Sequence, residues 1–268
     1  MTTGRGSLPE GGPGASSDLV SVIMPLYNCE AFVGEAVRSV ISQTYENWEL
    51  IVVDDCSTDG SLDVVAGYLD DRRIRVVRHQ ENRGASRARN TALRRVRGRY
   101  VAYMDADDVW MPGKLEHQLS FMARSGASMC FTSYETIEED GAHRNFVHVP
   151  ATITYRHFLK NTLTCSHTIM FDLSVVDVAW LLTPEESVPY DFPEDLDTWL
   201  RVLKHGVTGY GLDSIEAKNR KHGSSRSANH LAAVHRTWNQ YRRRENLPFL
   251  YSCYCLFWQL YHAVRKRM

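Results

Sequence analysis

Residues 99–108 read Arg99-Tyr100-Val101-Ala102-Tyr103-Met104-Asp105-Ala106-Asp107-Asp108 and give the strongest indication of the architecture. An apolar run of strand length ends directly in acids, which is typical of a buried parallel strand whose carboxyl end reaches a ligand-binding edge. Two carboxylates separated by one residue suit a divalent cation held against phosphate oxygens. The stretch therefore predicts an α/β protein that handles a nucleotide or a sugar phosphate.

Upstream of this stretch, the same unit is repeated. Apolar runs at residues 20–24, 49–53 and 74–77 alternate with helical patterns at residues 30–43, 61–69 and 85–95, and the first run is expected to end at Pro25. This alternation predicts a parallel sheet covered by helices on both faces. Because parallel strands end at one edge, we expect the polar residues 25–28, 54–55 and 105–108 to lie along one rim.

The pattern is looser downstream. It predicts a helix at 114–124, a strand at 129–133, a turn at 138–141, and a helix at 193–203 that starts with acids and ends at His205-Gly206. No internal repeat is visible.

Composition limits the class of protein. The chain has 268 residues, 43% of them hydrophobic, and a formal net charge of -1, which suits one large α/β domain and gives no indication of nucleic-acid binding. Six scattered cysteines without metal-ligand spacing favour reduced thiols in a cytoplasmic protein. Residues 1–18 are expected to form a disordered tail, and neither a secretory signal nor a membrane-spanning stretch is predicted.

Five motifs in order resemble those of the family 2 inverting glycosyltransferases of the GT-A fold. They are residues 20–28 (VSVIMPLYN), 52–61 (VVDDCSTDGS), 82–90 (NRGASRARN), 105–108 (DADD) and 194–195 (ED). The resemblance implies a Rossmann-like nucleotide-binding sheet flanked by helices, with a catalytic domain at 19–215. Its nucleotide-sugar half would cover about 19–112 and its acceptor half about 113–215, followed by a C-terminal basic loop and amphipathic helices at 216–268.

The resemblance also implies roles for the acids of the 105–108 motif. Asp105 and Ala106 would lie against the nucleotide sugar, and Asp105 and Asp107 would hold Mn²⁺ or Mg²⁺ at the diphosphate, with Asp108 as a helper. Taken alone, such acids are as often a solvated loop or a helix cap. The cation would neutralise charge that develops on the departing diphosphate.

The nucleotide-binding residues follow from the same match. Asp55 would accept a hydrogen bond from the imide of the base, with Pro25 and Tyr27 lining a uracil pocket, which favours a UDP-sugar. Gly84 would allow close approach of the backbone to the nucleotide. His222, in the segment 219–225 (NRKHGSS), resembles a diphosphate-contacting element.

Asp195 is the expected catalytic base. In the family the Glu194-Asp195 pair supplies the group that deprotonates the acceptor hydroxyl. On local grounds the pair also reads as ordinary acids at a helix N-terminus, and Asp197 is the alternative base.

The C-terminal stretch 247–268 combines aromatic and aliphatic side chains with a basic end. It predicts an amphipathic helix that either packs on the domain or lies on the inner face of an anionic membrane.

The resemblance thus implies a metal-dependent transferase that moves a sugar from a UDP-sugar to a saccharide or lipid-linked saccharide, as in the assembly of bacterial surface polysaccharides. Two alternatives stay open. Residues 105–109 (DADDV) also fit the motif of haloacid-dehalogenase-like phosphatases, although those enzymes place it on their first core strand. A non-catalytic, membrane-associated subunit that binds a nucleotide sugar is the other.

Overall fold

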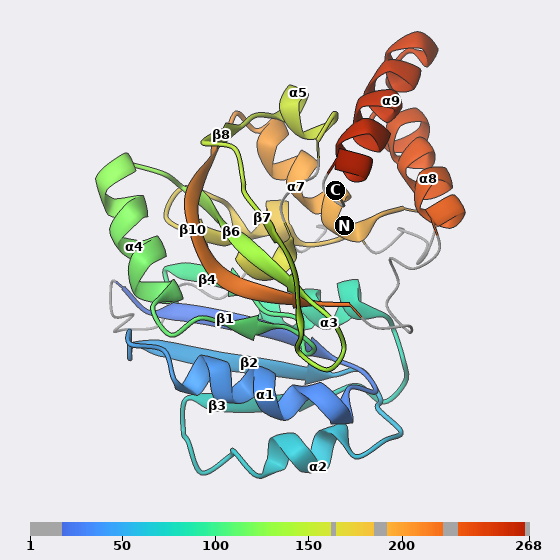
Figure 1. Ribbon diagram of the computed structural model, residues 1–268. Coiled ribbons are helices and arrows are strands. Elements are labelled where there is room, and N and C mark those ends of the chain that lie inside the picture. The colour runs from blue at the N-terminus through green and yellow to red at the C-terminus, as the bar shows by residue number, and fades with distance from the viewer. Residues whose placement is uncertain (1–17, 162–164, 185–191, 222–229, 266–268) are drawn as a thin grey trace, which may run out of the picture.

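A computed structural model describes residues 18–161, 165–184, 192–221 and 230–265 (Figure 1). The predicted disordered tail, apart from residue 18, and His222 lie outside the described residues. The alternation predicted for the first part of the chain is confirmed: β1 (Val20–Leu26), α1 (Glu30–Ile41), β2 (Trp48–Asp54), α2 (Ser61–Ala66), β3 (Ile74–Arg78), α3 (Ala85–Leu93) and β4 (Tyr100–Tyr103).

The second part of the chain adds shorter elements. They are β5 (Val109–Trp110), α4 (Lys114–Ser125), β6 (Met129–Ile137), β7 (His143–Val147), β8 (Thr152–Ile153), α5 (Tyr155–Phe158), η1 (Ser166–Thr168), β9 (Met170–Asp172), α6 (Val178–Leu181) and α7 (Glu194–Lys204). The chain continues with β10 (Gly209–Arg220), α8 (His230–Asn239), η3 (Gln240–Arg244) and α9 (Phe249–Arg265). The predicted end of the 193–203 helix is confirmed, because Gly206 takes the positive φ of +85° that glycine adopts after a helix.

All described strands join one sheet in the order β3-β2-β1-β4-β9-β6-β10-β5, with β7 beside β6 and β8 beside β10. β1 pairs in parallel with β2 and β4, so the carboxyl ends of these three strands meet at one edge. The predicted parallel sheet is confirmed for β1 to β4, and β3 also pairs in parallel with β2. Beyond β4 the sheet is mixed, because β9 is antiparallel to both β4 and β6 whereas β10 is parallel to β6. The long connection between β4 and β9 lets the chain return in the opposite direction.

Two predicted boundaries differ from the structure. β1 continues through Pro25 to Leu26, since pairing with β4 ends at Ile23 and Pro25 faces only Val53 of β2. A proline is tolerated where no neighbouring strand needs its missing N–H. The division drawn after residue 215 falls inside β10, whose pairing with β6 continues to Arg220.

The sheet separates two layers of apolar side chains. Val22 and Met24 of β1 pack with α1, α2 and α4 on one face, and Ile23 packs with α3, α7 and the C-terminal helices on the other. This alternation along β1 is the two-residue period of a strand buried on both faces. Residues of α3 and α7 therefore share the core on one face of the sheet.

Candidate active site

The carboxyl ends of β1 and β2 form the first part of the predicted rim. Tyr27 is 49% exposed directly after β1, and Pro25 is half-buried. Asn28 takes a positive φ of 45°, and its Oδ1 accepts a hydrogen bond from the Thr58 backbone N–H at 2.8 Å. The loops after β1 and β2 are therefore joined, and they leave the Tyr27 side chain open to a ligand.

Asp55 is buried and anchors the loop that precedes α3. Its Oδ1 lies 2.7 Å from His79 Nδ1 and accepts from the Arg83 backbone N–H at 3.0 Å, and its Oδ2 accepts from the Gly84 N–H at 2.6 Å. Gly84 has a φ of +83°, which favours glycine. The structure thus brings Asp55 and Gly84 together. The base-imide contact stays a prediction, and it would require Asp55 to accept a further hydrogen bond in addition to these.

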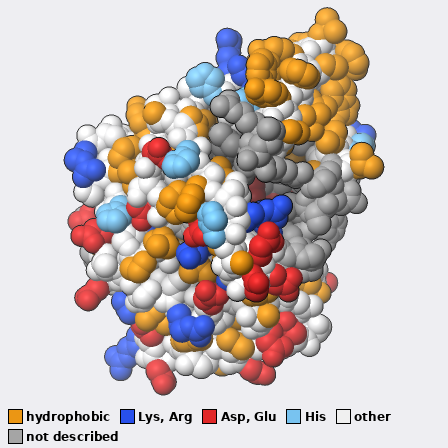
Figure 2. All heavy atoms as spheres, in the orientation of Figure 1, with side chains coloured by type: hydrophobic (Ala, Val, Ile, Leu, Met, Phe, Trp, Pro, Cys, Tyr) orange, Lys and Arg blue, Asp and Glu red, His pale blue; other side chains and the backbone are white. Residues whose placement is uncertain are grey.

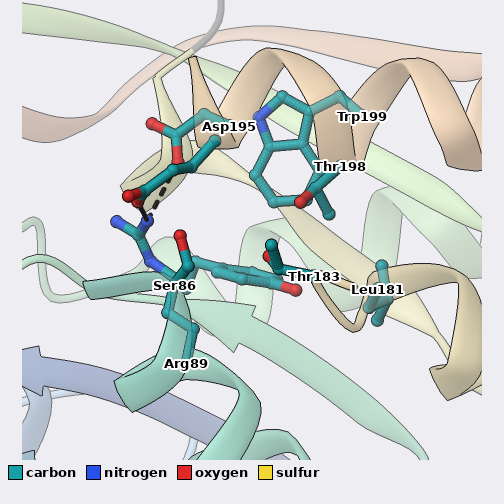
Figure 3. A pocket seen from close by; sticks show the side chains of 9 residues that line it. Ser86, Arg89, Leu181, Thr183, Asp195, Thr198 and Trp199 are labelled. Carbon is teal, nitrogen blue, oxygen red and sulfur yellow. Dashed lines mark hydrogen bonds and ion pairs between the residues drawn. The ribbon is translucent and has the colours of Figure 1, made fainter. Parts of the chain in front are cut away.

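Arg89 of α3 joins the motif after β4 to the start of α7. Its Nη2 donates to Asp105 Oδ1 at 2.7 Å. Its Nη1 donates to Asp195 Oδ1 at 2.9 Å, with Glu194 Oε2 3.8 Å away, and Figure 3 shows the contact with Asp195. Burial disfavours the guanidinium charge, but the Asp195, Asp105 and Glu194 carboxylates offset this and raise the pKa of Arg89. One cation therefore holds the predicted donor-side acid and the predicted base together.

Asp195 keeps its carboxylate accessible within this arrangement. Its side chain is 50% exposed, whereas that of Arg89 is only 12% exposed. Asp197, the alternative base, accepts from Arg201 Nη2 at 2.8 Å and from Gln240 Nε2 at 2.9 Å. The first bond lies within α7 and the second ties α7 to η3. Because Asp197 is engaged in both, the geometry favours Asp195 as the group that an acceptor can reach.

Asp105 also belongs to a second cluster of side chains, which could hold a metal ion. Asp105, Asp108 and His167 each offer a ligand atom, and these atoms lie within 4.8 Å of one another. Asp108 Oδ2 is 2.6 Å from His167 Nδ1, and both side chains are at most 1% exposed. His167 Nε2 is buried without a hydrogen-bond partner in the described part of the chain.

The donor set of this cluster fits a divalent cation, because carboxylate oxygens and an imidazole nitrogen are ligands that Mn²⁺ accepts. Burial alone would lower the pKa of His167, but the Asp108 carboxylate raises it to about 9. A cation that uses this imidazole must therefore displace a proton.

Asp107, the second predicted metal ligand, is not part of this group. Its backbone carbonyl accepts from Arg220 Nε at 3.1 Å, and the charge of its carboxylate adds to burial in raising the pKa of the Cys29 thiol to about 12. Asp108, expected only as a helper, also accepts from the Arg220 backbone N–H at 2.8 Å. Contacts with the end of β10 thus hold the loop after β4, and Ala106 of this loop is buried.

Arg89 and His167 were not assigned an individual role from the sequence, and Arg220 was expected only within the diphosphate-contacting segment 219–225. Arg89 carried a signal, since it lies in the 82–90 motif, but a solvated helix face was the simpler interpretation for it. His167 and Arg220 gave no local signal of contact with Asp108, because they are 59 and 112 residues away from it along the chain.

The amino-acid sequence matches the family model "Glycosyl transferase family 2" over residues 21–175. The chain belongs to glycosyl transferase family 2. This span contains β1 from its second residue, β2 to β4, the 105–108 motif and His167. Family membership removes the phosphatase alternative, as does the place of the 105–108 motif after the fourth strand of the chain instead of the first.

Two relatives agree with this assignment. A Bacillus subtilis (strain 168) protein named for teichuronic acid biosynthesis, TuaG, is 40% identical over 257 residues, which is 93% of this chain and 98% of that protein. The Escherichia coli protein WfgD is 37% identical over 222 residues, 82% of this chain and 84% of that protein. WfgD is named a UDP-Glc:alpha-D-GlcNAc-diphosphoundecaprenol beta-1,3-glucosyltransferase.

Solved structures confirm the GT-A fold. S. aureus TarS 1-349 in complex with UDP-GlcNAc superposes with a TM-score of 0.69 at 22% identity, covering 88% of this chain and 70% of that one. The mannosyltransferase PcManGT from Pyrobaculum calidifontis, in complex with GDP-Man and Mn²⁺, gives a TM-score of 0.61 at 19% identity, covering 92% and 70%. These similarities concern the fold alone.

Proposed function

We propose that the chain is an inverting, metal-dependent glycosyltransferase that moves a sugar from a UDP-sugar to a saccharide or lipid-linked saccharide acceptor. The observation that carries this proposal is the Arg89 bridge between Asp105 and Asp195. An inverting transfer needs a base on one side of the transferred sugar and a held leaving group on the other. Arg89 donates from one terminal nitrogen to Asp105 and from the other to Asp195, which supports a common site for the two predicted groups.

Each residue of the site has a role in the proposed reaction. Asp195 accepts the proton of the acceptor hydroxyl as its oxygen attacks the anomeric carbon. Asp105, together with Asp107 or with Asp108 and His167, would hold Mn²⁺ or Mg²⁺, which neutralises the charge of the departing diphosphate. Pro25, Tyr27 and Asp55 would bind the uridine, and Gly84 would let the backbone approach the nucleotide.

The identity of the substrates is inferred from relatives. WfgD is named for UDP-Glc as donor and for a diphosphoundecaprenol-linked GlcNAc as acceptor, and TuaG is named for teichuronic acid biosynthesis. We infer for this chain a neutral UDP-hexose and a lipid-linked saccharide of a bacterial surface polysaccharide. A lipid-linked acceptor would place the enzyme at the inner face of the plasma membrane.

The exposed face of α9 supports contact with that membrane. Leu250 is 81% exposed, Phe257 63% and Tyr261 47%, and hydrophobic side chains gather over α9 in Figure 2. Cys255 and Ser252 of the same helix are buried against the domain, so α9 both packs on the protein and presents an apolar surface. Among the described residues, none of the helices has the length and apolar character to cross a bilayer.

Incubation with a panel of UDP-sugars and Mn²⁺ tests the proposal. We expect release of UDP from at least one donor, and faster release when a saccharide acceptor is added. No turnover or hydrolysis with any donor would favour the alternative of a non-catalytic binding subunit.

A further inference from the structure

The short element η3, between α8 and α9, contacts the helix that carries the predicted base. The Arg244 guanidinium lies over the Phe192 ring, 4.7 Å from its centroid, and Phe192 stands two residues before α7 begins. Gln240 Nε2 donates at 2.9 Å to Asp197 Oδ1, in the first turn of α7. The two ends of η3 therefore hold the same part of α7 in which Asp195 lies.

Glu245, directly after η3, holds the other end of α7. Its Oε2 lies 2.6 Å from Nζ of Lys204, the last residue of α7, and accepts from the Tyr155 hydroxyl at 2.5 Å. Its Oε1 accepts from Gln240 Nε2 at 3.3 Å. The Glu245 side chain is only 5% exposed, and a buried carboxylate is stable only when it is paired and hydrogen-bonded. Its three partners therefore fix it in place, and α7 is held along its whole length.

The backbone of η3 explains how these side chains reach one helix. The Glu245 backbone N–H donates to the Gln240 carbonyl at 2.9 Å, which closes a π-type turn with five residues between donor and acceptor positions. In an α-helix, with 3.6 residues per turn, side chains five positions apart point to different sides. The wider turn brings Gln240, Arg244 and Glu245 to the side that faces α7. Single π turns are rare and are frequently found at functional sites.

The Gln240 amide can take only one orientation here. Its side chain is fully buried, and its nitrogen contacts the carboxylates of Asp197 and Glu245. Ionised carboxylates only accept hydrogen bonds, so the amide nitrogen and not the amide oxygen must face them. This bond fixes how far α7 is rotated about its axis. Asp195 lies two residues before Asp197 on the same helical turn, so the rotation of α7 decides where its half-exposed carboxylate points.

We propose that Gln240 and Arg244 are positioning residues for the base Asp195, acting through α7. Arg89 holds the Asp195 carboxylate from the donor side, and η3 holds the helix beneath it from the C-terminal helices. The family model matches residues 21–175 and so contains neither α7 nor η3. The C-terminal helices are in this way part of the catalytic machinery and not only a surface for membrane contact. This inference rests on the function proposed above and deepens it.

Gln240→Met and Arg244→Met test the inference through the split between catalysis and nucleotide binding. We expect each variant to lower kcat for transfer from UDP-glucose to a lipid-linked GlcNAc acceptor by at least about tenfold, because a misplaced base loses its reactive geometry. The Kd for UDP, measured by titration calorimetry, should stay within about twofold of the wild type, since the predicted uridine-binding residues lie at the ends of β1 and β2. Arg243→Met, which changes the exposed neighbour of Arg244 in the same turn, is the matched control and should leave both quantities unchanged.

Two results would overturn the inference. One is a wild-type kcat in both variants, with the fold checked by circular dichroism. The other is an equal loss of kcat and of UDP affinity, which would mean that η3 supports the fold in general and not the base. Because the two substitutions lie at opposite ends of η3, the test stays decisive if one variant is unstable. Both results require an active wild type, so they are distinct from failure of the proposed function, in which no UDP-sugar is turned over.

Discussion

Arg89 gives the site its organisation at the scale of the residue. One terminal guanidinium nitrogen donates to Asp105 and the other to Asp195. Without Arg89 these two carboxylates would repel one another. A fixed arginine fork supports two carboxylates at defined positions more effectively than the point charge of a lysine. We therefore regard Arg89 as a positioning residue for the predicted base.

Arg89→Lys and Arg89→Met separate charge from geometry. We expect Arg89→Met to lower kcat by at least about tenfold, because Asp105 and Asp195 lose their common partner, and Arg89→Lys to recover only part of the loss. Steady-state kinetics with added guanidinium, which should partly rescue Arg89→Met, provide the measurement. A full recovery by Arg89→Lys would contradict the requirement for a fork.

The two possible cation sites make different predictions for metal binding. If Asp108 and His167 act with Asp105, His167→Gln should weaken Mn²⁺ binding by about 10-fold or more, and Asp107→Asn should have a smaller effect. Titration calorimetry in the presence of UDP measures this without turnover. The reverse order would restore the pair Asp105 and Asp107 expected from the motif resemblance.

The sequence predicted the acids of the site better than their partners. Asp105 and Asp195 were found because each stands next to a recognisable element, a strand end and a helix start. The contacts of His167 and Arg220 with Asp108 were not predicted, because they depend on the return of β9 beside β4 and on the position of β10, two strands beyond β9 in the sheet. Asp55 was found, but the hydrogen bonds that bury it come from the 79–84 segment and needed the structure.

At the scale of the element, α4 contains a buried lysine. Lys114 is 0% exposed, donates to Gln118 Oε1 at 2.5 Å and lies 4.0 Å from the centroid of Trp110. Burial lowers its pKa from 10.5 to about 7. Between these pH values the unfolded chain binds more protons at this residue than the folded chain does, so folding stability rises with pH.

Lys114→Met removes this dependence. We expect the stability of the wild type minus that of the variant to increase from pH 6.5 to pH 8.5, with a slope on the order of 1 kcal/mol per pH unit above pH 7. Urea unfolding at the two pH values measures the difference. A difference that stays constant or decreases would mean that the lysine keeps its charge when buried.

Helices and strands of the first part of the chain were predicted to within a few residues because each has a strong period and a clear end. Prediction was weaker after residue 125, where short strands such as β8 and β9 have too few residues to show a period. The antiparallel insertion of β9 between β4 and β6 is a tertiary arrangement that local pattern does not encode.

At the scale of the whole molecule, one sheet connects the two proposed halves. Asp105 follows β4, and Asp195 lies in the first turn of α7. β9 pairs with both β4 and β6, so the strands of the two proposed halves belong to one continuous sheet. The C-terminal pair α8 and α9 stands at one end of this body (Figure 1), where α9 exposes its apolar side chains.

Binding to vesicles tests the proposed contact of α9. Leu250→Glu combined with Phe257→Glu should lower binding to anionic lipid vesicles by at least about tenfold, because each side chain loses its apolar contribution. Phe146→Glu, which changes a 53% exposed side chain on β7, is the matched control. Equal flotation of the wild type and the double variant would contradict the contact.

The central claim is that Asp195 acts as the base in a single displacement at a metal-held UDP-sugar. The most direct measurement is the anomeric configuration of the product formed from UDP-α-glucose, Mn²⁺ and a lipid-linked GlcNAc acceptor, followed by NMR with the wild type and with Asp195→Asn. We predict a β-linked product from the wild type and, in the variant, a loss of transfer of about 10²- to 10⁴-fold with UDP binding retained. An α-linked product, or a variant that transfers at the wild-type rate, would contradict the claim.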